Sequence, residues 1–169
     1  MSGKTVRVVP AGPGDRPAVE RLLRDYLREL SASDAGPAPE ARGYPYLDLY
    51  WTEPDRRAFL IRSGDRIAGF ALVNAWSPPG RPVDHAMAEF YVKPAYRRAG
   101  TGTRAATEVI AGLPGTWEIG VLAAHGSARA FWTHVLERMF GVVPEWIGGD
   151  RRRWSGRILR FRSMGRSAF

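Results

Sequence analysis

Residues 88–105, AEFYVKPAYRRAGTGTRA, decide the fold of this chain. The stretch begins with an alternating run that places Phe90 and Val92 on one face and Glu89 and Tyr91 on the other, which predicts a short strand. A basic, glycine-bearing turn follows, and small and apolar residues at helical spacing then predict a helix. This arrangement binds phosphate groups, because the first helical N–H groups have no intrahelical partner and the helix dipole favours negative charge there.

Three known motifs bind phosphate with such a turn. A P-loop is excluded because the required lysine is absent. Gly100, Gly102 and Ala105 match the dinucleotide fingerprint G-x-G-x-x-[GA], but residues 93–99 separate the turn from the strand, and Glu118 lies inside the next strand-like run. The third motif, [QR]-x-x-G-x-[GA], fits residues 97–102, and the stretch resembles motif A of the GCN5-related N-acetyltransferases (the GNAT superfamily). The alternative is an ordinary loop with two exposed arginines.

Composition limits the other classes of protein. The 169 residues predict a single domain over 1–169, with residues 163–169 as a flexible tail. No apolar run approaches 18 residues and no signal peptide is recognisable, so we expect a cytoplasmic protein without a membrane span. The chain has no cysteine and three histidines, so we expect no metal site. The net charge of +8 attracts polyanions, but the basic residues are scattered and nucleic acid is the less favoured partner.

The rest of the chain alternates between strand-like and helix-like segments. We expect Asp15 to be the N-cap of a first helix. The apolar face predicted for this helix consists of Val19, Leu22, Leu23, Tyr26, Leu27 and Leu30. Helices are also expected at residues 102–111 and within 125–140, and a short helix or lid within 42–54. The face expected within 125–140 consists of Ala128, Phe131, Trp132, Val135 and Met139. Strands are expected at residues 5–9, 57–62, 67–74, 84–92, 117–122, 145–147 and 154–161.

This order resembles the GNAT topology over nearly the whole chain. The resemblance implies an α/β fold with a mixed, mostly antiparallel sheet of about seven strands and about four helices, splayed between strands four and five. A second family motif, N-x-x-A-x-x-F-[YW], is matched by His125, Ala128, Phe131 and Trp132. The whole pattern is similar to a bacterial branch of acetyltransferases.

The resemblance also implies a reaction and a cofactor. It implies transfer of an acetyl group from acetyl-CoA, or of another acyl group from its CoA ester, to the primary amine of a small molecule in one ternary complex. By this resemblance, pantetheine and diphosphate contact a set of residues drawn from strand four, the turn and the later helix. They are Phe90, Tyr91, Val92, Arg97, Arg98, Ala99, Gly100, Thr101, Gly102, Thr103, His125, Ala128, Phe131 and Trp132.

The resemblance places Glu89 as the general base that accepts the proton of the amine. A carboxylate that only binds the substrate ammonium, or an edge salt bridge, is the alternative, and Asp84 and His85 are the back-up candidates. Trp132 stands where many family members have tyrosine, and an indole N–H cannot protonate a leaving thiolate. We therefore expect water to do so.

Aromatic residues with polar tips gather in the stretch RGYPYLDLYWTEP, residues 42–54. By position in the family fold, Tyr44, Tyr46, Asp48 and Trp51 join Glu89 in the predicted acceptor pocket. The alternatives are a protein or peptide N-acetyltransferase and a non-catalytic module that binds CoA or nucleic acid. A homodimer is one option for the assembly.

Overall fold

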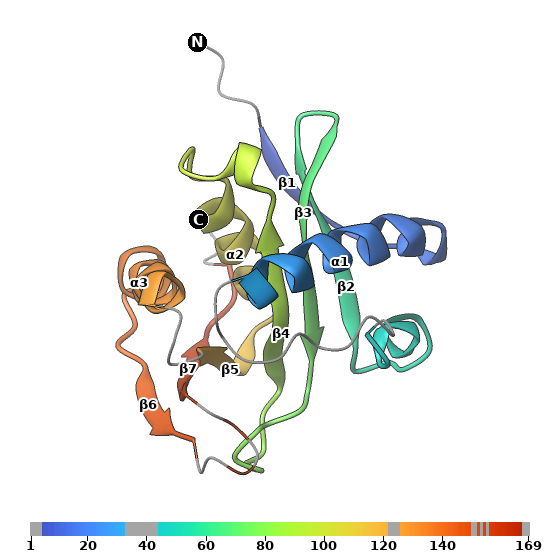
Figure 1. Cartoon of the computed structure of the whole chain (residues 1–169). Coiled ribbons are helices and arrows are strands. Elements are labelled where there is room, and N and C mark those ends of the chain that lie inside the picture. Colours follow the sequence, from blue (N-terminus) through green and yellow to red (C-terminus); the bar gives the residue numbers. More distant parts are fainter. Residues whose placement is uncertain are drawn as a thin grey trace. The chain divides into compact units, whose positions relative to one another are not determined.

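The computed structural model of this chain describes residues 5–32, 44–121, 126–149, 152, 154 and 156–166. Figure 1 labels its strands and main helices. The strands are β1 Val6–Pro10, β2 Arg57–Ser63, β3 Arg66–Asn74, β4 His85–Val92, β5 Gly115–Val121, β6 Glu145–Gly148 and β7 Arg157–Ser163. The α-helices are α1 Arg16–Ala32, α2 Thr101–Gly112 and α3 Gly126–His134. The short helical turns are η1 Pro13–Asp15, η2 Leu47–Trp51, η3 Pro94–Tyr96 and the π-helical η4 Val135–Met139.

The strands form a seven-stranded sheet in the order β1-β2-β3-β4-β5-β7-β6. The pairs β1–β2, β2–β3, β5–β7 and β6–β7 are antiparallel, whereas β4 and β5 are parallel. The parallel register runs from His85↔Trp117 to Met87↔Ile119 and then ends, although β4 continues to Val92. The predicted mixed sheet with a splay between its fourth and fifth strands is therefore confirmed, and η2 is the expected short helix.

The chain divides into two compact units, and β4 and α2 each contribute residues to both. The first consists of Met1–Val73 and Glu89–Gly102, and the second of Asn74–Ala88 and Thr103–Phe169. The single domain predicted from the sequence stays a prediction.

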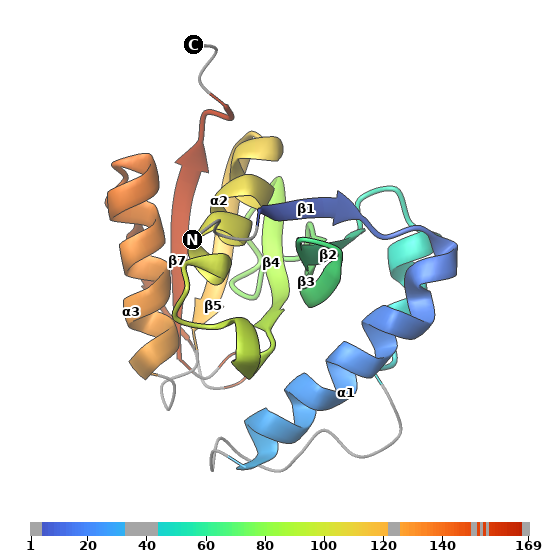
Figure 2. The same cartoon turned by 90° about the horizontal axis from the view of Figure 1, so that it is seen from above.

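In the first unit, α1 lies on one side of β2 and β3 (Figures 1 and 2). It buries Val19, Leu22 and Leu23, as its apolar spacing predicts. β3 approaches β4 very closely at Gly69, where a Cβ atom would stand 2.0 Å from the carbonyl oxygen of Tyr91. Only glycine fits at that point, and the close approach fixes the part of β4 that carries the candidate site.

In the second unit, the indole of Trp117 is fully buried, and its Nε1–H donates to the carbonyl oxygen of Leu113 at 2.8 Å. Glu118 is also buried and pairs with Arg160 of the neighbouring β7 at 2.6 Å. The Ser163 hydroxyl donates to the Ile110 carbonyl oxygen of α2 at 3.1 Å. β5 and β7 are thus fixed to each other by charge and β7 to α2 by a buried hydrogen bond.

Three local predictions differ from the structure. Asp15 is not the N-cap; it closes η1, and its carboxylate accepts the Gly12 N–H at 2.9 Å. The helical face expected to end in Met139 buries Leu136 instead and leaves Met139 47% exposed, because the π-helical turn changes the spacing of the side chains. Ser163, expected in the tail, is a buried residue of β7.

The second strand of the final hairpin begins and ends later than expected. β7 begins at Arg157, so Trp154 lies before the strand rather than in it. The indole of Trp154 lies against Gly120 of β5, where a Cβ atom would stand 2.6 Å from the ring. Packing of this side chain, rather than strand pairing, accounts for the apolar residue at that position.

Candidate active site

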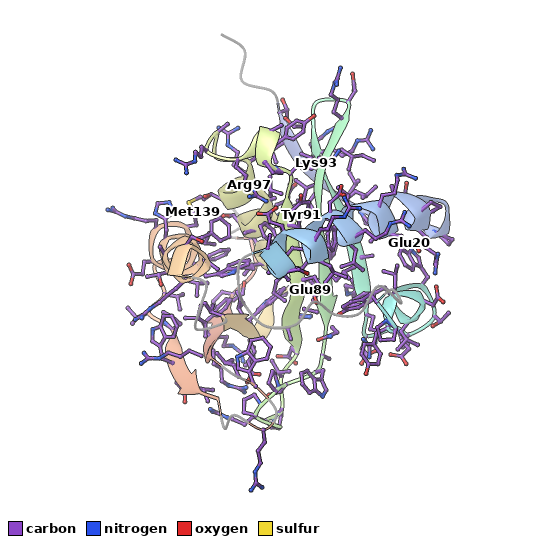
Figure 3. The ribbon with its side chains drawn as sticks, in the orientation of Figure 1. Glu20, Glu89, Tyr91, Lys93, Arg97 and Met139 are labelled. Atoms are coloured by element: carbon purple, nitrogen blue, oxygen red, sulfur yellow. The ribbon has the colours of Figure 1, made fainter. Side chains whose placement is uncertain are left out.

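Glu89 is the centre of the candidate site in the first unit. It lies in β4 on the same face as Tyr91, as the alternation predicted, and both face α1 (Figure 3). Tyr26 of α1 and Tyr44, just before η2, each hydrogen-bond its carboxylate through their phenol groups. Two segments distant in sequence therefore converge on one carboxylate.

Burial dominates the electrostatics of this carboxylate. It raises the pKa of Glu89 to about 7, because a carboxylate loses hydration in this surrounding, while the hydrogen bonds from Tyr26 and Tyr44 act in the opposite direction. Burial and the neighbouring carboxylate together raise the pKa of both phenols. Tyr26 and Tyr44 therefore stay protonated and act as donors to Glu89.

A second layer of polar contacts lies behind Tyr44. Its phenol hydrogen-bonds that of Tyr50, which is buried in η2. Arg56 hydrogen-bonds Tyr50 in turn, and its guanidinium carbon lies 5.5 Å from the centre of the Tyr50 ring. The Nε of Arg56 also donates to Glu53 at 2.6 Å. The carboxylate at β4 is thus connected to a cation near the surface.

The turn after β4 is held by Arg97. Its Nη1 and Nη2 donate to the two carboxylate oxygens of Glu29 at 2.7 and 2.8 Å, and its Nε donates to the Val92 carbonyl oxygen at 2.7 Å. The same guanidinium lies 5.5 Å from the Tyr91 ring centre. Arg97 therefore connects α1 to the turn, and only two of its five N–H groups remain for another ligand.

The backbone between Arg97 and α2 forms an open turn. Arg98 has a φ of 63° and Gly100 a φ of 77°, so the chain turns sharply before α2 begins at Thr101. A Cβ atom added at Gly100 would have no other atom within 4 Å, so the turn is open on that side. The first N–H groups of α2 have no intrahelical acceptor. With Arg98 exposed beside them, they provide donors and positive charge suited to a diphosphate.

The two back-up candidates in the second unit have other partners. The Asp84 carboxylate accepts the Thr116 N–H at 2.7 Å, and this hydrogen bond lowers its pKa. The His85 Nε2 lies 3.1 Å from the Pro114 carbonyl oxygen, an acceptor, so this nitrogen carries the proton. Both groups fix the beginning of β4 against the segment that leads into β5.

The predicted acceptor residues separate into two groups. Tyr44 contacts Glu89, but Asp48 is exposed and pairs with Arg16 at 2.6 Å. Tyr46 is 55% exposed, with its ring 6.1 Å from that of Tyr44. The indole Nε1–H of Trp51 donates to the Ala11 carbonyl oxygen at 2.9 Å. The structure thus brings one of these four residues to the carboxylate.

The second predicted motif lies on α3. The Phe131 and Trp132 rings are 4.9 Å apart, and Trp132 is buried in the second unit. Ala128 is half-buried on the same helix. His125 lies outside the described residues.

The sequence alone did not place Tyr26, Tyr50, Arg56 or Glu29 around the Glu89 carboxylate. Tyr26 was assigned to the apolar face of the first helix, and its phenol was the one signal that this face also carries a polar group. Among the described residues, no group of three His, Cys, Asp or Glu residues could hold a metal ion. Within those same ranges, no helix is long and apolar enough to cross a membrane.

Solved structures share this fold. An acetyltransferase from Thermus thermophilus has a TM-score of 0.68 at 19% identity, over 96% of this chain and 99% of that chain. The ribosomal-protein alanine N-acetyltransferase from Escherichia coli has a TM-score of 0.59 at 15% identity, with 98% and 99% covered. A spermidine N-acetyltransferase from Vibrio cholerae, in complex with CoA and spermine, has a TM-score of 0.58 at 14% identity, with 92% of each chain covered. No curated protein sequence matches the chain.

The fold is the one that the resemblance implied, and the glycine turn lies between β4 and α2 as expected. The model of the acetyltransferase (GNAT) family matches residues 19–137, and the chain belongs to this family. The predictions of an N-acetyltransferase and of acetyl-CoA as its cofactor are thereby confirmed.

Proposed function

We propose that this acetyltransferase acts on the primary amine of a small molecule, by direct transfer in a ternary complex, with Glu89 as the general base. The observation that carries the proposal is the half-buried Glu89 carboxylate, held by two phenols and with its pKa raised to about 7. An alkylamine has a pKa near 10, so it must lose a proton before it attacks. A carboxylate that titrates near 7 is ionised at slightly alkaline pH and is basic enough to accept this proton, directly or through one water.

The cofactor would be held by β4 and the turn after it. Backbone groups of Phe90, Tyr91 and Val92 are proposed to contact pantetheine, and the N–H groups of residues 98–103 the diphosphate. Bound acetyl-CoA supplies the acetyl group as an activated thioester. With Arg97 committed to Glu29, Arg98 is the side chain best placed to add positive charge.

The surroundings of Glu89 support a small amine. Tyr26 and Tyr44 present aromatic rings beside a carboxylate, a combination that favours an ammonium group through charge and cation–π attraction. The net charge of +8 opposes the approach of polycations, so we propose an amine with a single positive charge. A protein or peptide N-terminus is the alternative acceptor.

The test combines binding and turnover. Acetyl-CoA should raise the thermal unfolding temperature of the protein by mass action. Release of CoA thiol is then measured with benzylamine, spermidine and a peptide that begins with alanine. Turnover with benzylamine above that with the peptide supports the proposal, and the reverse order overturns the substrate class.

Glu89→Gln tests the base. This variant should retain the acetyl-CoA shift and lose turnover by about 100-fold or more, the usual contribution of general base catalysis. Unchanged turnover would exclude Glu89 from proton transfer. A cytoplasmic location, a bacterial source and a homodimer stay predictions.

A further inference from the structure

Three buried or half-buried polar groups lie in a row behind Glu89, and none of them exchanges a proton with the amine in the proposed reaction. They are the phenols of Tyr44 and Tyr50 and the guanidinium of Arg56. All belong to the first unit: Tyr44 precedes η2, Tyr50 lies in it and Arg56 follows it. Tyr50 is 4% exposed, so its hydroxyl depends on protein partners rather than on water.

The direction of each hydrogen bond in this row is fixed by chemistry. Arginine has only donors, so the Tyr50 oxygen accepts from Arg56. The ionised Glu89 has only acceptors, so the Tyr44 O–H donates to it. Because the single proton of Tyr44 is used there, the bond between the phenols runs from the Tyr50 O–H to the Tyr44 oxygen. All three bonds therefore point toward Glu89.

We propose that Arg56, Tyr50 and Tyr44 form a one-way donor chain that orients the Glu89 carboxylate and keeps it ionised for proton transfer. The inference rests on the proposed role of Glu89 as the base. The chain cannot conduct a proton, because its far end is a guanidinium that does not release one. Its members are positioning residues, since each acts on the reaction through Glu89.

The chain also opposes protonation of Glu89. A protonated carboxyl can still accept from Tyr44 through its carbonyl oxygen, but more weakly than the carboxylate does. If it donated to Tyr44 instead, both phenol protons would have to turn toward Arg56, which has no acceptor for the last of them. A buried donor left without an acceptor is costly, so the reversed chain is unfavourable. The network thus limits the increase in the pKa of Glu89 that burial causes.

Other charged and titratable groups face this carboxylate from the elements packed against it. On α1, Tyr26 donates a second hydrogen bond, and Glu29 lies near Tyr26 but is paired with Arg97. On β4, Tyr91 lies on the same face as Glu89, with its ring 5.6 Å from that of Tyr26. Tyr26 does not belong to the row that reaches Arg56, so it provides an independent comparison.

The test follows the titration of Glu89 directly. The side-chain carboxyl carbons of glutamate are labelled with ¹³C, and the Glu89 signal is assigned by its loss in Glu89→Gln. Tyr44→Phe should raise the titration midpoint by about half to one pH unit, since a hydrogen bond to the charged form is lost. Tyr96→Phe in η3 is the matched control and should leave the midpoint unchanged. The proposal is overturned if Tyr44→Phe does not raise it.

A double-mutant cycle distinguishes an effect of Arg56 that passes through the hydrogen bonds of Tyr50 from a direct electrostatic effect of its charge on Glu89. Arg56→Met should raise the midpoint by a few tenths of a pH unit, whereas the exposed neighbour Arg57→Met should not. In a Tyr50→Phe background the effect of Arg56→Met should disappear, because the hydrogen bond that transmits it is absent. An undiminished effect would show that the charge acts through space and would overturn the chain. Thermal unfolding of each variant confirms that it is folded.

Turnover distinguishes failure of this inference from failure of the proposed function. With benzylamine as acceptor, kcat/KM is measured as a function of pH. In Tyr44→Phe the midpoint of the acidic limb of this profile should move to higher pH by the same amount as the titration midpoint of the Glu89 carboxyl. A shift in titration without a shift in the rate profile would overturn the link to proton transfer. Full activity of Glu89→Gln would instead refute the proposed base.

Discussion

Replacing Glu89 by glutamine should stabilise the fold at alkaline pH while it removes activity. Burial raises the pKa of Glu89 from its ordinary value of 4.5 to about 7, so the folded protein holds this proton more tightly than the unfolded chain. Below about pH 4.5 the carboxyl group is protonated in both the folded and the unfolded state, so it does not lower the free energy of unfolding. Stability is lost as pH rises from the unfolded pKa through the folded one, and above pH 7 the loss is complete.

The size of this effect follows from the difference between the two pKa values. At 1.36 kcal/mol per pKa unit, the upper bound is about 3 kcal/mol. Because the side chain keeps some contact with solvent, we expect roughly 1–2 kcal/mol in the free energy of unfolding. In a protein of this size, that corresponds to about 2–8 °C in Tm.

The assay is thermal unfolding of the wild type and Glu89→Gln at pH 4 and pH 8. The Tm of Glu89→Gln relative to wild type should be higher at pH 8 than at pH 4 by about 2–8 °C. The exposed Glu145→Gln is the control, and its difference from wild type should change little with pH. An equal Glu89→Gln difference at both pH values would refute a desolvated carboxylate.

Other substitutions test a buried ion pair, a close contact between strands and the glycine turn. Glu118→Gln removes the counter-charge of a nearly buried arginine and should lower the free energy of unfolding by about 3–5 kcal/mol in urea, against less than about 1 kcal/mol for Glu145→Gln. Similar losses in the two variants would contradict burial of the pair. Gly69→Ala should prevent normal folding because its Cβ meets backbone at 2.0 Å, whereas Gly14→Ala meets nothing within 4 Å; equal stability would disprove the close strand contact. Gly100→Ala should lower the free energy of unfolding by about 1–2 kcal/mol, because Gly100 has a φ of 77°. It should also reduce the increase in Tm that acetyl-CoA causes. An unaltered increase would exclude this turn from the diphosphate site.

Several features of the site were predictable because they depend on short segments. The alternation in β4 placed Glu89 and Tyr91 on one face, and the structure brings both to α1. The glycines and arginines of the following turn predicted a break and a helix start, and α2 begins at Thr101. Such patterns are local consequences of backbone geometry and side-chain spacing.

Other features depended on residues that meet only in the folded chain. Asp48, expected in the pocket, pairs with Arg16, whereas Tyr26, assigned to a core face, donates to Glu89. Arg97, expected at phosphate, is held by Glu29. In each case a polar tip has several possible partners in the sequence, and packing decides which of them lies within reach.

The sequence by itself determined the order of helices and strands and the glycine turn, since periodicity and turn chemistry act over a few residues. The resemblance to the family, rather than these patterns, singled out Glu89. The tertiary structure alone decided the surroundings that set the chemistry of Glu89: burial, two phenol donors and the row that ends at Arg56. These depend on contacts between α1, the segment around η2 and β4, which are far apart in the chain. Loss of hydration and the direction of hydrogen bonds arise only when those segments pack together.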